Sequence, residues 1–127
     1  KILWEYANDE RNAAFMSAPA LASDRVLIGG RDGRLHAVER TSGKRLWTFR
    51  GRGDFDASPI VWGDLVAAAT TRGMLYLVRL ADGEEVWSHD LGAGIEASPA
   101  VADGRLVLAC SDGRLVAFGR ADGKAKP

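Results

Sequence analysis

The sequence lacks several features that would assign it to a class of protein directly. Its one cysteine, Cys110, cannot form an internal disulfide, so cysteine usage leaves the redox compartment undecided. It contains no run of about 18 apolar residues, so we expect no transmembrane segment. It begins without a methionine and without a basic stretch followed by an apolar one, so no signal peptide is visible.

An excess of charge of one sign is also missing. Lys and Arg together number 17, as do Asp and Glu, and the net charge is zero. Proteins that bind nucleic acids concentrate basic side chains on one surface, so we expect no nucleic-acid partner. The charges are unevenly distributed, however: residues 17–53 carry eight basic and three acidic side chains, and residues 54–96 carry two and eight. Neighbouring segments of opposite sign should attract each other, which would help to fix their order.

The feature that stands out is a repeat of 40 residues, and such a period indicates a stacked or circular repeat architecture. Trp4 precedes Trp47 by 43 residues, so the first connection is longer by three. The positions that recur at the interval of 40 are Pro19, Pro59 and Pro99; Gly33, Gly73 and Gly113; Leu35, Leu75 and Leu115; Gly43, Gly83 and Gly123; and Trp47 and Trp87.

Each repeat is predicted to hold four short strands. The first begins at the proline, where a missing N–H costs no ladder hydrogen bond. The second and third are joined by a two-residue turn whose glycine supplies a positive φ. A second glycine turn leads to a fourth strand, which we expect to end at the tryptophan. The strands are apolar on both faces, as sheets sandwiched between neighbours must be.

These patterns predict an all-β protein, a β-propeller segment of about three four-stranded antiparallel blades. The predicted divisions are residues 1–16 (an outer strand of a preceding blade plus a loop), 17–53 and 54–96 (complete blades), and 97–127 (an incomplete blade of three strands). Propellers close with about four to eight blades, so this ring is incomplete. Either the remaining blades of a longer chain or a second copy of this chain would complete it.

The segment from Ala37 to Trp47 resembles the tryptophan-docking motif of the PQQ-like (pyrroloquinoline quinone) β-propeller repeat family. That motif has an alanine, a glycine six residues later, a lysine, and a tryptophan at the eleventh position; the second copy keeps Gly83 and Trp87. The resemblance covers essentially the whole chain and implies that each tryptophan packs between adjacent blades. The residues assigned to structural docking on this ground are Trp4, Trp47, Trp87, Gly43, Gly83, Gly123, Ala37 and Ala117.

The family contains two functional classes that this chain could belong to. Quinoprotein dehydrogenases hold PQQ, with a calcium ion, against a disulfide between adjacent cysteines, and this sequence has only Cys110. The chain is also similar to the outer-membrane assembly lipoproteins of the BamB family, which implies a non-catalytic scaffold for protein partners in the periplasm or cell envelope. We predict the scaffold, without catalytic, cofactor-binding or metal-binding residues; the alternative is a fragment of a dehydrogenase whose cofactor residues lie elsewhere. His36 is interpreted as a packing residue and His89 as an exposed one.

One set of charged residues is a candidate binding face. Loops that precede the first strand of a blade and turns between its second and third strands should lie at the same end of the scaffold, where binding residues usually concentrate. The alternative interpretation is a solvated rim without a partner. The residues of the candidate face are Asp54, Asp56, Glu96, Arg31, Arg72 and Asp112, with Asp32 beside them.

Overall fold

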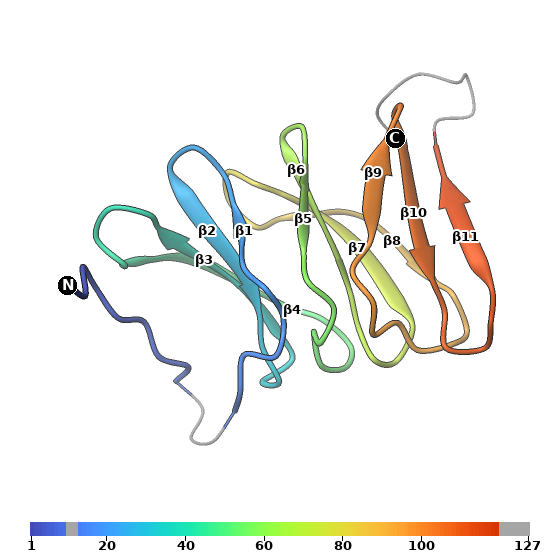
Figure 1. Cartoon of the computed structure of the whole chain (residues 1–127), viewed down its shortest axis with the longest axis horizontal. Coiled ribbons are helices and arrows are strands. Elements are labelled where there is room, and N and C mark those ends of the chain that lie inside the picture. The colour runs from blue at the N-terminus through green and yellow to red at the C-terminus, as the bar shows by residue number, and fades with distance from the viewer. Residues whose placement is uncertain (10–12, 120–127) are drawn as a thin grey trace.

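The computed structural model describes residues 1–9 and 13–119, and every regular element in these ranges is a β-strand. Three antiparallel sheets stand side by side without closing into a ring (Figure 1). The first strands of successive sheets contact each other, β1 (Ala20–Leu21) with β5 (Ile60–Trp62) and β5 with β9 (Ala100–Ala102). This is the arrangement of propeller blades around a common centre, and it confirms the predicted fold class.

Each sheet is a meander in which strands adjacent in sequence pair with each other. The third sheet has three strands, and its fourth would fall after residue 119, outside the described residues. The remaining strands are β2 (Arg25–Gly29), β3 (Arg34–Glu39) and β4 (Arg45–Arg50) in the first sheet, β6 (Leu65–Ala69), β7 (Met74–Arg79) and β8 (Glu85–Asp90) in the second, and β10 (Arg105–Ala109) and β11 (Leu115–Phe118) in the third.

One expectation about the outer strands is wrong. The fourth strand does not end at the tryptophan: it continues by three residues to Arg50 or Asp90, because its ladder with the third strand continues, with Leu35 opposite Phe49. Residues 1–9 have no strand structure here. The predicted outer strand would pair within a preceding blade, which is not among the described sheets, so this assignment stays a prediction.

The core consists of two layers, one between each pair of neighbouring sheets. Successive side chains of a strand point to opposite faces, so in β7 Tyr76 and Val78 pack towards the first sheet while Leu75 and Leu77 pack towards the third. All five residues of β6 are buried. The middle sheet is covered on both sides, and both of its faces are accordingly apolar.

Candidate functional site

The tryptophans of the repeat lie against the next sheet. The Trp47 ring is so close to Gly83 that a Cβ added there would be 2.5 Å from it, and its Nε1–H donates to the carbonyl of Leu80 at 3.0 Å. Trp4 has the same relation to Gly43 and donates to the carbonyl of Arg40 at 2.8 Å. Both glycines have φ of 75°, a conformation that favours glycine.

The third copy of this contact is described only in part. Trp87 lies edge-on to Phe118, with 5.4 Å between ring centroids, and stacks on the exposed His89. Gly123, the expected partner of Trp87, lies outside the described residues. Ala37 is buried opposite Trp47 in the β3–β4 ladder, whereas Ala117 is exposed on β11, the last described strand.

The loops that lead into each sheet, which we call the lead-in loops (residues 13–19, 51–59 and 91–99), are held at one end of the blades. Each is bonded to the β-turn after the second strand of its own sheet: Thr71 N–H donates to the carbonyl of Asp54 at 2.9 Å, and Arg31 and Ser111 make the same bond to their own loops. The second and third loops also donate to the preceding sheet, as Phe55 N–H does to the carbonyl of Gly30 at 3.2 Å. A loop bonded on both sides is held rigidly, which favours its use for binding.

The charged residues of the candidate face are not equally available. Arg31 binds Asp56 through two hydrogen bonds of 3.1 Å, and this partner raises the pKa of the guanidinium. Asp112 pairs with Arg114 at 2.7 Å, and the hydrogen bond lowers the pKa of its carboxyl group. Three of the six charged residues of the face are therefore already paired, which leaves fewer free charges than the sequence suggests.

The other three members of the face have no internal partner among the described residues. In the part of the chain that the structure describes, the side chains of Asp54, Arg72 and Glu96 make no hydrogen bond or ion pair, and Arg72 and Glu96 are exposed. Asp32, which the sequence suggested as a neighbour of this face, is not part of its surface. Its side chain is only 2% exposed and bonds to His36 at 2.8 Å.

A buried hydrogen-bonded series was missed by the sequence analysis. His36 is buried, as expected of a packing residue, but its Nε2 bonds to Asp32 and its Nδ1 to the Tyr6 hydroxyl at 2.7 Å. In a neutral imidazole whose Nε2–H donates to the Asp32 carboxyl group, Nδ1 accepts from the Tyr6 hydroxyl. Burial lowers the pKa of His36, although Asp32 opposes the shift. The series ties the N-terminal segment to the first sheet, a contact that no local pattern could predict.

This chain by itself cannot supply the adjacent-cysteine disulfide that the resemblance associates with PQQ. Its one cysteine, Cys110, is buried, and the 127 residues contain no second one. Within residues 1–9 and 13–119, no group of three or more His, Cys, Asp or Glu side chains is placed to hold a metal ion. Nor does that part of the chain contain a helix with the length and hydropathy needed to cross a bilayer.

Comparison with known structures supports the same architecture. The crystal structure of BamB from Moraxella catarrhalis is similar, with a TM-score of 0.74 and 23% identity over 83% of this chain and 33% of that chain. The quinohemoprotein alcohol dehydrogenase ADHIIG from Pseudomonas putida HK5 is similar with a TM-score of 0.78 and 16% identity, over 87% of this chain and 19% of that chain. The chain thus spans a third or less of these relatives, and the likenesses establish the fold alone. No curated protein matches the chain.

A family profile matches the sequence directly. It is described as outer membrane protein assembly factor BamB, and it aligns with residues 1–54 and 31–126. These two overlapping matches cover nearly the whole chain, and their overlap is what an internal repeat produces. The chain therefore belongs to the PQQ-like β-propeller repeat family described as outer membrane protein assembly factor BamB.

Proposed function

We propose that this chain is part of a non-catalytic propeller scaffold that binds protein partners in the bacterial cell envelope. The observation that carries the proposal is the pair of second and third lead-in loops, which are bonded to β-turns on both sides while Asp54, Arg72 and Glu96 keep free charged side chains. A rigid loop loses little conformational entropy on binding, which favours affinity. The description of the family as an outer membrane assembly factor supports both the role and the compartment.

The partner surface should be complementary in charge to these free groups. Asp54 and Glu96 flank the second sheet at the end where the lead-in loops lie, and Arg72 belongs to the turn between them. A partner that offers a basic side chain to each carboxylate and an acidic one to Arg72 would satisfy all three. Charge complementarity of this kind mainly sets specificity and the rate of association.

Affinity capture from the envelope fraction of the source bacterium tests the proposal. The double variant Arg72→Glu, Glu96→Lys reverses two free charges without changing the net charge. Glu84→Lys, exposed on the β7–β8 turn at the other end of the blade, is the control. We expect the double variant to lose the proteins that the wild type and the control retain. Identical capture by all three chains would refute a binding role for this face.

A second candidate function is that of a segment of a quinoprotein dehydrogenase. It is favoured by the structural likeness to the quinohemoprotein alcohol dehydrogenase. Titration with PQQ and calcium, followed by the absorbance of bound quinone, separates the two functions. The scaffold proposal predicts no saturable binding, and a quinone spectrum that saturates at one equivalent would favour the dehydrogenase instead.

A further inference from the structure

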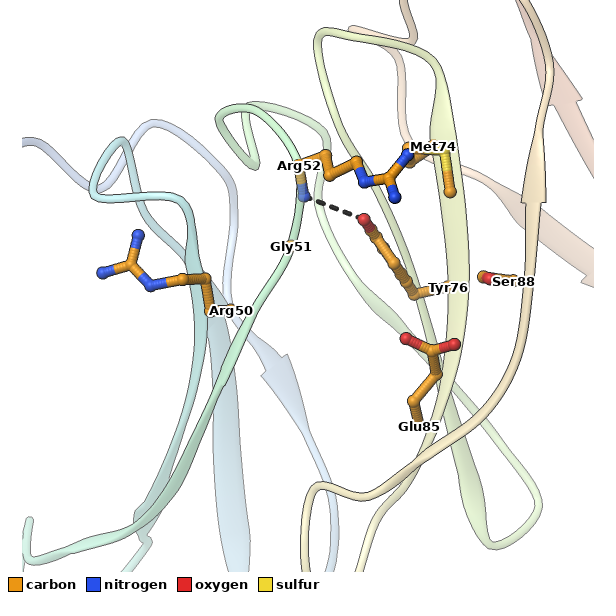
Figure 2. A pocket seen from close by; sticks show the side chains of 7 residues that line it. All are labelled: Arg50, Gly51, Arg52, Met74, Tyr76, Glu85 and Ser88. Carbon is orange, nitrogen blue, oxygen red and sulfur yellow. Dashed lines mark hydrogen bonds between the residues drawn. The ribbon is translucent and has the colours of Figure 1, made fainter.

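A groove of about 520 Å³ opens between the first two sheets, where β4 ends and the second lead-in loop begins. Its size is within the range of about 300–1,000 Å³ that is typical of ligand sites. It adjoins the candidate binding face, since Arg52 lies two residues before Asp54 and a Cβ added at Gly53 would be 2.9 Å from the Arg72 side chain. Figure 2 shows the residues that line it, among them Arg50, Arg52, Met74, Tyr76, Glu85 and Ser88.

The wall of the groove that carries the arginines is held in place by the backbone. Gly51 packs so closely that an added Cβ would lie 2.6 Å from the Phe55 ring and 2.8 Å from the Tyr76 ring. The N–H of Arg52 donates to the Tyr76 hydroxyl at 2.8 Å, as the dashed line in Figure 2 shows. The backbone of Arg52 is therefore anchored while its guanidinium extends over the groove towards Met74.

The groove presents hydrogen-bond donors that lack acceptors. Tyr76 is only 4% exposed, and its hydroxyl accepts from Arg52, but its own proton has no acceptor among the described residues. A buried donor without an acceptor is costly and therefore uncommon. Within the same part of the chain, the Ser88 hydroxyl and the Arg52 guanidinium also bond to no protein atom. The Arg52 guanidinium lies near the Tyr76 hydroxyl in Figure 2, whereas Ser88 lies beside the backbone of Tyr76. Two neighbouring donors suit an oxyanion, and a guanidinium suits a carboxylate in particular.

Two further side chains set the charge around these donors. Arg50 is also without a partner in the described structure, but it points away from Tyr76 in Figure 2, so it contributes positive potential rather than a contact. Glu85 lies at the opposite end of the groove from Arg52. The groove is therefore positive at one end and negative at the other.

The other copies of the repeat do not have this arrangement. In the first copy Asp9 stands where Arg52 stands in the second, and it forms an ion pair with Arg45, the counterpart of Glu85. In the second copy the two signs are exchanged, and Arg52 and Glu85 form no ion pair. The third copy has Gly92 at the position of Arg52, so its groove lacks the guanidinium. The backbone arrangement recurs in each repeat. Among the described repeats, only the second has an arginine and a glutamate at these positions without an ion pair between them.

We propose that the groove binds an acidic side chain of an extended partner segment, with a basic side chain of the same segment meeting Glu85. The inference rests on the proposed scaffold function and names the chemistry of one partner contact. The carboxylate would accept from the Arg52 guanidinium and the Tyr76 hydroxyl. A polyanion such as a nucleic acid would be repelled by the eight acidic side chains of residues 54–96, whereas a segment with both signs would not.

A capped tetrapeptide of aspartate, two glycines and lysine serves as the probe, titrated into the ¹⁵N-labelled 127-residue chain and followed by NMR. We expect saturable shifts at the amides of Arg52, Tyr76 and Ser88 and none at Gly92, the equivalent position of the next groove. Arg52→Gln should weaken binding roughly tenfold, because one charge-assisted hydrogen bond is lost. Arg40→Gln, the same change of charge at the other end of the blade, should bind like the wild type.

Absence of shifts at the groove, or equal binding by the Arg52→Gln variant, would overturn the proposal. Inorganic phosphate, or a peptide with glycine in place of lysine, could also bind as tightly as the probe peptide. Either result would mean a general anion site and would overturn the proposal. The scaffold function is judged separately by partner capture. If capture persists while the peptide does not bind, only the groove inference fails; if the peptide binds while no partner is captured, the scaffold proposal fails.

Discussion

The contact between Trp47 and the second sheet provides the most decisive test of the architecture, through the variant Trp47→Ala. A fully buried indole removes about 150–250 Å² from water, which at about 25 cal/mol per Å² stabilises by about 4–6 kcal/mol. Trp47 is only partly buried, so about half of this applies. Its hydrogen bond to Leu80 adds about 1 kcal/mol. The expected loss of unfolding free energy is therefore about 3–4 kcal/mol, a large share of the stability of a typical domain.

Urea denaturation followed by far-UV circular dichroism measures this loss. Leu46→Ala is the matched control, since Leu46 is the adjacent residue of β4 and is 39% exposed; it should cost less than about 1 kcal/mol. Trp47→Phe should lie between the two, because it retains part of the ring packing and loses the N–H donor. If Trp47→Ala and Leu46→Ala unfolded at the same urea concentration, the tryptophan would not join the two sheets, and the reasoning would be refuted.

Three further predictions concern Gly83, His36 and Arg31. Gly83→Ala should lower the unfolding free energy by at least about 1–2 kcal/mol, because φ is positive there and the new Cβ meets Trp47; wild-type stability in urea would contradict this. Burial lowers the pKa of His36 in the folded chain below its unfolded value of 6.5. Below pH 6.5 the unfolded chain therefore binds more protons than the folded chain, and the unfolding free energy should fall as pH decreases through the lower folded pKa. Urea midpoints between pH 7.5 and 5 should show this slope, and His36→Val should flatten it. Arg31→Gln should change stability little, because the Arg31 guanidinium of the pair with Asp56 is about half exposed; a large loss in urea would point to a structural role.

Much of the fold follows from local patterns. The glycine turns, the prolines before the first strands and the apolar runs between them predict four strands per repeat, because each depends only on neighbouring residues. The ends of the outer strands do not follow in this way. β4 continues to Arg50 because β3 offers a ladder partner there.

The candidate site could be predicted only in part. The period indicates which loops share an end of the blades, but Arg31 and Asp56 neutralise each other across 25 positions of the sequence. The groove was not anticipated at all, since Arg52 and Tyr76 are 24 positions apart and look like an ordinary linker and strand residue. The residues at these two positions differ from those in the other copies of the repeat. This difference indicates a groove only once the structure shows that the two positions lie side by side.

By itself, the sequence determined the repeating architecture, because backbone geometry and alternating burial act over a few residues and recur at a constant interval. Only the tertiary structure decided which charged and polar groups are consumed by internal pairs and which stay free for a partner. Pairing depends on distances between side chains from different sheets, and those distances arise when the blades pack.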